Sequence, residues 1–162
     1  MSEFNIRRAS EEDVDEIYRM LRELAAHLKE PDAVTTTPEK LRQDQKLYQC
    51  MVAESMTAGD SASKPLLGFA LYVYKYDACK GQMAILDSFY VAPENRSRGI
   101  GLSLMKAVEQ DVAECGCSQM EMLVHDWNAR AIEFYLKRSA VNYTDQMHWH
   151  IYRIPLSNIS KT

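Results

Sequence analysis

Long apolar runs are missing from this sequence of 162 residues. No stretch of 18 consecutive apolar residues occurs, so the chain offers no candidate for a membrane-spanning helix. The first five residues also lack the basic segment and the apolar segment that a secretory signal needs. We therefore expect a cytoplasmic protein with no membrane partner.

An excess of positive charge is missing as well. The 19 Lys and Arg residues are outnumbered by 23 Asp and Glu residues, which gives a formal net charge of −4. Nucleic acid binds to basic faces, so we expect no nucleic-acid partner. A mildly acidic surface is compatible with a small cationic substrate but does not require one.

Cysteine is scarce, with four residues and no C-x-x-C pair. Cys115 and Cys117 are too close together for an ordinary zinc knuckle, so we expect no metal site and reduced thiols. Hydrophobic residues make up 46% of the chain and charged residues 26%, which is typical of a globular protein. We expect a single domain over residues 1–162, because this length suffices for one hydrophobic core.

The spacing of apolar residues predicts alternating strands and helices. The predicted strands cover residues 4–8, 48–54, 66–76, 82–91, 120–124 and 148–154. The predicted helices cover residues 11–29, a short segment that begins at 38, 99–114 with Leu102, Leu104, Met105 and Val108 inward, and 129–138. A stretch rich in small residues, 55–65, predicts a surface loop. This order predicts an α+β fold of three layers, with a mixed, mostly antiparallel sheet of six to seven strands and helices on both faces.

A glycine-containing motif, R-x-x-G-x-G, lies between a predicted strand and a predicted helix. Its residues are Arg96, Ser97, Arg98, Gly99, Ile100 and Gly101. The backbone N–H groups at a helix start have no acceptor inside the helix, and together with the helix dipole they suit a pyrophosphate. The motif alone is equally compatible with a turn that carries two solvated arginines.

Three further residues are candidates for chemistry. Asp87 interrupts an apolar strand, where a carboxylate is costly to desolvate, so it has either a partner or a function, unless it lies on a solvated face. Asn128 and Tyr135 lie seven residues apart and share one helix face. Tyr135 could equally be a core aromatic beside Phe134.

Taken together, these features resemble the GNAT superfamily of N-acetyltransferases, in which R-x-x-G-x-G follows the fourth strand and N-x-x-A-x-x-x-Y comes later. The chain is most similar to the spermidine/spermine (diamine) and thialysine N-acetyltransferase group. The matching segments are Ile6-Arg7, Gly68-Phe69-Ala70, Tyr76-Asp77, Arg96 with Gly99-Ile100-Gly101, Cys117-Ser118-Gln119-Met120, Asp126-Trp127-Asn128 and Phe134-Tyr135. The resemblance runs over nearly the whole chain.

The resemblance implies a site for acetyl-CoA as co-substrate, direct attack by an amine in a ternary complex, and a homodimer. The residues that it assigns to acetyl-CoA are Phe89, Tyr90, Val91, Arg96, Ser97, Arg98, Gly99, Ile100, Gly101, Asn128, Tyr135, Lys137 and Arg138. It makes Tyr135 the general acid for the leaving thiolate. Asp87 occupies the position of a carboxylate that is usually Glu, and because Asp is shorter, we expect a water bridge to the amine. The group usually has Gly after the tyrosine, where this chain has Ser139.

The resemblance also assigns His27, Asp77, Asp87 and Leu123 to the substrate groove. Leu28, Ser88 and Met147 stand at three positions where polyamine enzymes have acids, and Cys79 stands where Trp is usual. A long polycation needs negative charge along its length, so thialysine or a similar lysine-like amine is favoured over polyamines. Acetylation of polyamines, of peptides or of proteins, and a non-catalytic module that binds acetyl-CoA, remain as alternatives.

Overall fold

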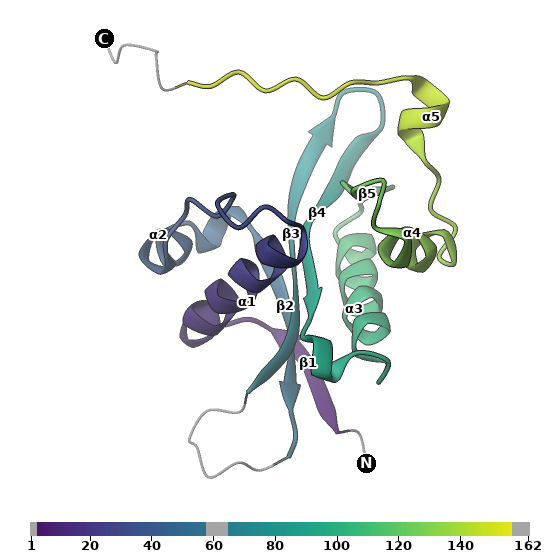
Figure 1. The fold of residues 1–162 in the computed structure, drawn as a ribbon. Coiled ribbons are helices and arrows are strands. Elements are labelled where there is room, and N and C mark those ends of the chain that lie inside the picture. Colours follow the sequence, from purple (N-terminus) through teal and green to yellow (C-terminus); the bar gives the residue numbers. More distant parts are fainter. Residues whose placement is uncertain (1–2, 58–64, 157–162) are drawn as a thin grey trace. The chain divides into compact units, whose positions relative to one another are not determined.

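The structure is a computed structural model that describes residues 3–57 and 65–156 (Figure 1). These residues belong to two compact units, Met1–Leu123 and Val124–Thr162, and each is described by itself. The loop predicted between residues 55 and 65 lies mostly outside the described residues. Within the described residues, no helix combines the length and the apolar character that crossing a membrane requires.

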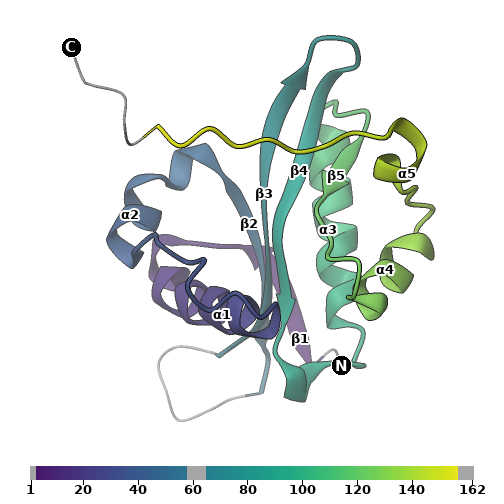
Figure 2. The same ribbon diagram turned by 45° about the horizontal axis from the view of Figure 1, so that its top comes forward.

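The first unit is built on a five-stranded sheet in the order β1-β2-β3-β4-β5. The strands are β1 (Phe4–Arg8), β2 (Gln49–Ser55), β3 (Leu66–Asp77), β4 (Gly81–Val91) and β5 (Met120–Met122). β1 to β4 pair antiparallel, whereas β5 is parallel to β4 because a helix connects them. The β3–β4 pairing continues to Asp77 and Gly81, beyond the end of the β2–β3 pairing, so this hairpin projects from the sheet (Figure 2).

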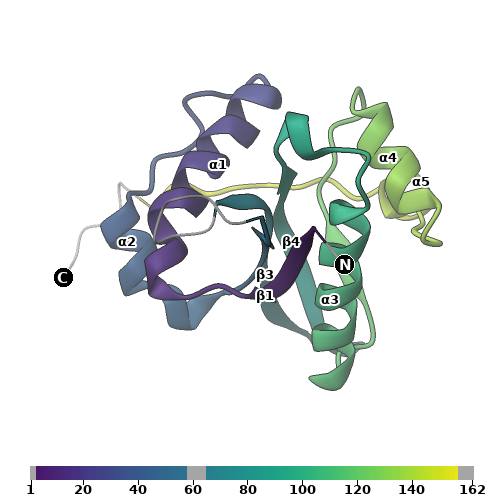
Figure 3. The same ribbon diagram turned by 90° about the horizontal axis from the view of Figure 1, so that it is seen from below.

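Helices cover both faces of this sheet. The helices of the first unit are α1 (Val14–His27), α2 (Pro38–Gln43) and α3 (Ile100–Glu114), with 3-10 turns at Glu11–Asp13, Gln45–Leu47 and Pro93–Asn95. α1 and α2 lie on one face and α3 on the other, as Figure 3 shows. The predicted helix starts are confirmed: Asp13 accepts a hydrogen bond from the amide of Ser10 at 2.7 Å, and the Thr37 hydroxyl accepts one from the amide of Lys40 at 3.2 Å.

The core lies between the sheet and its two helical layers. Residues 66–72 of β3 are all buried, which explains why this strand is a continuous apolar run instead of an alternating one. On the α3 side, the buried stripe of the helix consists of Ile100, Leu104, Met105, Val108, Asp111 and Val112. Leu102, predicted inward, is 43% exposed, because its position on the helix lies away from this stripe.

A buried carboxylate fixes α3 to the sheet. Asp111 accepts hydrogen bonds from the hydroxyl groups of Tyr72 and Tyr74, the latter at 2.8 Å, and forms an ion pair with Arg8 of β1. Burial and the neighbouring Asp111 together raise the pKa of Tyr72, so this phenol remains a donor. The contacts connect β1, β3 and α3 and set the position of the helix whose first turn carries the glycine motif.

The second unit contains α4 (Ala129–Leu136) and α5 (Tyr143–Met147). The strand predicted for residues 148–154 is wrong: the structure assigns no strand to this segment, and the sheet among the described residues has five strands instead of six to seven. Alternation predicts a strand only where one face is buried, yet Ile151, Tyr152 and Ile154 are 66%, 86% and 82% exposed. The short helix α5 was not predicted.

Candidate active site

The candidate site begins at a bulge in β4. Leu71 of β3 lies opposite Ser88, and Tyr72 lies opposite Leu86, so Asp87 is an extra residue in the antiparallel ladder. A bulge bends the strand and redirects the side chain at that point. Asp87 is exposed, and its Oδ2 accepts a hydrogen bond from the Ser88 hydroxyl at 3.0 Å. The carboxylate therefore lies at a solvated position, because the bulge turns it outward; its catalytic role stays a prediction.

Beyond this bulge, β4 loses its second neighbour in the sheet. The parallel ladder pairs Ala84 with Met120 and Leu86 with Met122, and it ends there. β4 continues to Val91 in a ladder with β3 alone. A strand edge of this kind can bind an extended ligand by backbone hydrogen bonds, in the way that peptides add to sheets.

The loop after β4 leads into α3 through two left-handed residues, Ser97 (φ 64°) and Gly99 (φ 80°). A Cβ on Gly99 would meet no atom within 4 Å, so the need for glycine there is conformational, not spatial. The first helical hydrogen bond runs from the Ser103 amide to the Gly99 carbonyl at 3.0 Å, which leaves the amides of Ile100 and Gly101 without an acceptor inside the helix. This geometry suits an anion.

The loop before α3, with the first turn of that helix, lies beside the end of β4. A Cβ built on Gly101 would be 3.6 Å from Phe89 Cζ and 3.7 Å from Val91 Cγ2, so the first turn of α3 packs on this strand end. On the neighbouring strand β3, a Cβ on Gly68 would be 2.6 Å from the Tyr90 carbonyl oxygen. Gly68 was one residue of a segment that resembles the family, and a glycine inside a strand is itself a signal for close backbone approach.

The two arginines of the motif have different surroundings. Arg96 donates from Nε to the Val91 carbonyl at 2.9 Å, and its guanidinium lies 5.8 Å from the centre of the Tyr90 ring. Arg98 donates to the Asn95 side chain at 2.9 Å and forms an ion pair with Glu3. Arg96 therefore contacts the end of β4, whereas Arg98 connects the loop to Glu3, the residue before β1.

Besides Asp87 at the bulge, the residues predicted for the substrate groove lie at three places in the first unit. His27 is the exposed last residue of α1, and Leu123 follows β5 and is 70% exposed. Asp77 lies at the end of β3, where its Oδ1 accepts hydrogen bonds from the amides of Cys79 and Lys80, both at 2.9 Å. Asp77 thus closes the hairpin turn, a structural role that the sequence did not predict.

In the second unit, α4 carries the other predicted residues. Asn128 is the N-cap, and its Oδ1 accepts a hydrogen bond from the Ala131 amide at 3.3 Å. Burial raises the pKa of Tyr135 to about 12. Lys137 pairs with Glu133 at 2.6 Å, whereas Arg138 is half-buried.

The backbone at the end of α4 adopts a conformation that favours glycine, although this chain has serine there. Ser139 adopts a left-handed conformation, with φ 63°. Its amide donates to the Leu136 carbonyl at 3.0 Å, and the Ala140 amide donates to the Tyr135 carbonyl at 3.2 Å. This is a Schellman motif, so the helix ends as a glycine would end it, with a serine in the strained position.

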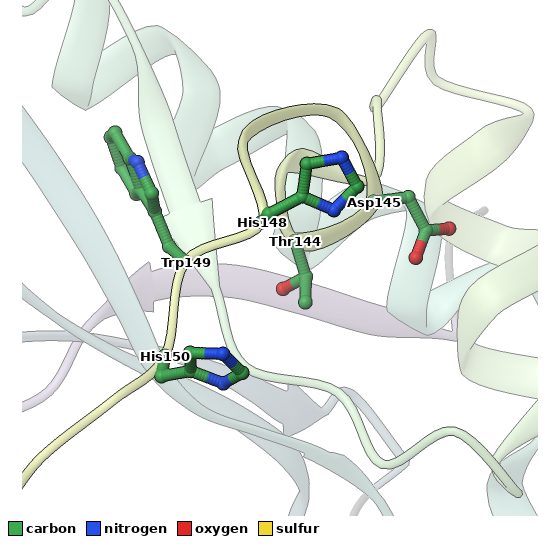
Figure 4. Close-up of a pocket in the computed structure, with 5 residues that line it drawn as sticks. All are labelled: Thr144, Asp145, His148, Trp149 and His150. Atoms are coloured by element: carbon green, nitrogen blue, oxygen red, sulfur yellow. The ribbon is translucent and has the colours of Figure 1, made fainter.

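A shallow hollow in the second unit is lined by Thr144, Asp145, His148, Trp149 and His150 (Figure 4). The ring of Trp149 points away from the two imidazoles. Across the described parts of the chain, no three or more His, Cys, Asp or Glu side chains are grouped so that they could hold a metal ion. All four cysteines are free thiols.

Comparison with known proteins agrees with this geometry. The family model described as "Acetyltransferase (GNAT) family" matches residues 14–139. The thialysine N-epsilon-acetyltransferase of Bos taurus is 38% identical over 153 residues, covering 91% of this chain and 90% of that protein. The spermidine/spermine N(1)-acetyltransferase-like protein 1 of Homo sapiens is 33% identical over 157 residues, covering 94% of this chain and 23% of that protein.

Solved structures share the fold at low sequence identity. An aminoglycoside acetyltransferase from an uncultured soil metagenomic sample, in complex with sisomicin, superposes with a TM-score of 0.71 at 18% identity and covers 94% of this chain and 97% of its own. A strand edge beside an amide-lined helix start, a family match across most of the chain and relatives above 30% identity lead to one conclusion. The chain belongs to the GNAT family and is an acetyltransferase.

Proposed function

We propose that this protein transfers the acetyl group of acetyl-CoA to the primary amine of a small, lysine-like substrate such as thialysine. One observation supports the proposal above all: the first turn of α3 packs at Gly101 against the end of β4. One ligand can then use the strand edge and the helix amides at the same time. A pantetheine arm ending in a pyrophosphate has this combination of groups.

The residues present fit acetyl-CoA. Gly99 and Ser97 shape an amide-lined loop at the start of a helix of 15 residues, and Arg96 adds a positive charge beside it. The β4 segment after Leu86 would hold the extended arm. Acetyl-CoA supplies the activated acetyl group, and this chain's own residues bind it and move the protons.

The acceptor must lose a proton before it attacks, because alkylamines have a pKa near ~10 and are protonated at neutral pH. Asp87 accepts that proton in our proposal. Its carboxylate is exposed at the bulge and is held by the Ser88 hydroxyl, so water reaches it. The short side chain favours proton transfer through a bridging water molecule.

Tyr135 acts as the proton donor to the leaving sulfur. With a pKa of about 12, its phenol holds a proton at neutral pH and does not act as a base. Full transfer to a thiolate of pKa ~8.5 is uphill by roughly 3.5 units, or about 5 kcal/mol. A barrier of roughly 16 kcal/mol corresponds to about 10 turnovers per second, so this step is compatible with ordinary enzyme rates.

The choice of acceptor rests on the small number of acids in the groove. Leu28, Ser88 and Met147 stand where polyamine enzymes carry acids, and Ser88, the residue after Asp87, is buried. One oxygen of Asp77 is occupied by the hairpin amides. The groove therefore offers charge for one cationic group near the reacting amine and little for a second one far from it. The printed name of the Bos taurus relative, which contains thialysine, also supports this choice.

An acetylation assay over thialysine, lysine, spermidine, spermine and a lysine-containing peptide tests the proposal. We expect the highest kcat/KM for thialysine. A higher kcat/KM for spermidine would overturn the substrate assignment, and a higher value for the peptide would favour protein acetylation. Binding of acetyl-CoA without transfer to any acceptor would instead indicate a non-catalytic module.

The proposal treats residues 1–162 as one catalytic domain. The matched family model supports this, because it runs from residue 14 to residue 139 and so spans both compact units. We also propose a homodimer, as the resemblance to diamine acetyltransferases implies, and light scattering after gel filtration measures it directly.

A further inference from the structure

A chain of contacts connects α1 with the loop that leads into α3. Tyr90, on β4, is 5% exposed and packs in the core cluster that includes Ile17 and Met20 of α1. Its hydroxyl donates to Glu23 Oε2 at 3.2 Å. The two residues are 67 positions apart in the sequence, which is why no local pattern revealed the contact.

The other end of this chain of contacts is Arg96. Its guanidinium lies 5.8 Å from the centre of the Tyr90 ring, a distance at which a cation is attracted by the aromatic face. Its Nε donates to the Val91 carbonyl at 2.9 Å. Among the described residues, the two terminal nitrogens of Arg96 have no hydrogen-bond partner, so they remain available to an anion.

Glu23 is itself held in place. It forms an ion pair with Arg19 one turn earlier in α1, and Arg19 also pairs with Glu16 at 2.6 Å. Burial raises the pKa of Tyr90, and the negative charge of Glu23 raises it further, so the phenol remains a neutral donor toward this carboxylate. A carboxylate at the phenol oxygen makes the ring more electron-rich, which strengthens its attraction for a guanidinium.

We propose that Glu23 is a positioning residue for acetyl-CoA: through the Tyr90 hydroxyl it fixes the ring against which Arg96 is held, and so sets the guanidinium for the phosphate groups of the donor. This inference rests on the proposed function, because it assumes that the loop binds acetyl-CoA. It assigns a role in donor binding to a helix that the glycine motif does not include.

The test compares two ligands and three variants by calorimetry. Acetyl-CoA carries the phosphates, whereas acetyl-pantetheine has the same arm and thioester without them. Tyr90→Phe removes only the hydroxyl, Glu23→Gln removes the charge at a partly exposed position, and Glu16→Gln is the matched control, since it removes an Arg19 partner that does not contact Tyr90.

We expect Glu23→Gln and Tyr90→Phe each to weaken acetyl-CoA binding about three- to tenfold, the usual effect of weakening or losing one ordinary hydrogen bond. In the same variants, binding of acetyl-pantetheine should weaken far less than binding of acetyl-CoA. The double variant should be no weaker than the weaker single variant, because both act through one path. Glu16→Gln should bind both ligands as the parent does.

Parental acetyl-CoA affinity in a folded Glu23→Gln variant would overturn the inference. Equal weakening of both ligands would also overturn it, because the change would then act on the strand and not on the phosphate contacts. If the parent protein itself binds no acetyl-CoA, the proposed function fails. If the parent binds acetyl-CoA and the variants bind it equally well, only the role of Glu23 fails.

Discussion

Replacing Gly68 by alanine is the sharpest test of how the strand end is built. Gly68 lies opposite Val91 in the β3–β4 ladder. The added Cβ would be 2.6 Å from the Tyr90 carbonyl oxygen and 3.2 Å from Val91 Cα. Carbon–oxygen contacts are ordinarily at least ~3.3 Å, so one strand must move by about 0.7 Å. Val91 Cγ2 would also lie at 3.2 Å, but rotating that side chain cannot relieve the contacts with the two backbone atoms.

The magnitude follows from two opposing terms. Overpacking of this kind costs about 1–3 kcal/mol. Reducing the freedom of the unfolded chain returns about 0.4–1 kcal/mol. The net loss of about 1–2 kcal/mol corresponds to a fall in Tm of roughly 3–6 °C for a chain of this size. A displacement near 1 Å in a binding strand can cost about 10²-fold in rate, so we expect kcat/KM for acetyl-CoA to fall by about 10- to 100-fold.

Thermal unfolding and steady-state kinetics measure the two effects. Gly101→Ala serves as the stability control, because its Cβ would meet Phe89 and Val91 at ordinary contact distances of 3.6 and 3.7 Å. Alanine is also the better helix former by about 1 kcal/mol, so this variant should unfold at or above the parent temperature. A Gly68→Ala variant with parental Tm and kcat/KM would refute the geometry of the strand end.

Three further predictions concern a proton donor, a helix end and an ion pair. Tyr135→Phe should lower kcat by about 10²- to 10³-fold with little change in acetyl-CoA affinity, and equal kcat in the variant would contradict a donor role. Because the pKa of Tyr135 is about 12, the parental kcat should not decrease with rising pH until the pH exceeds about 10. Ser139→Gly should raise the free energy of unfolding by about 0.5–1 kcal/mol in chemical denaturation, since it relieves a φ of 63°; no gain would mean that the serine is not strained. Burial alone would raise the pKa of Asp13, but hydrogen bonds from Arg7 and Ser10 hold it below its usual value. The stability from this carboxylate is therefore complete above pH ~4 and is lost as the pH falls through the lowered pKa, so Asp13→Asn should be less stable than the parent at pH 7, and the gap should close in strong acid; a constant gap would exclude the charge as its cause.

Local patterns predicted most of the secondary structure, because helices and turns are decided by neighbouring residues. The capping pattern at Ser10, the proline after Thr37 and the glycine before Ile100 each mark a helix start that the structure confirms. The four antiparallel strands follow from apolar runs joined by turns. The strand expected at residues 148–154 failed, because alternation describes a strand but cannot supply the neighbour that it pairs with.

The candidate site divides in the same way. The motif from Arg96 to Gly101 was predicted as an amide-lined helix start, and its geometry agrees, because glycine at a positive φ is a local requirement. Whether Asp87 is exposed could not be decided from the sequence, which left both alternatives open, since the answer depends on a register shift between two strands. The sequence also did not predict that Asp77 accepts hydrogen bonds in the hairpin turn, because only a role in substrate binding was expected for it.

The sequence by itself determined the family, the helix starts and the glycine-containing loop before α3, because each of these depends on residues that are neighbours along the chain. Only the tertiary structure decided that β5 stops at Met122 while β4 continues to Val91, and that Gly68 and Gly101 both lie close to that strand end. It alone placed Glu23 against the Tyr90 hydroxyl. The physical reason is that ladder length, bulges and side-chain contacts across the sheet depend on the packing of segments that are distant in sequence.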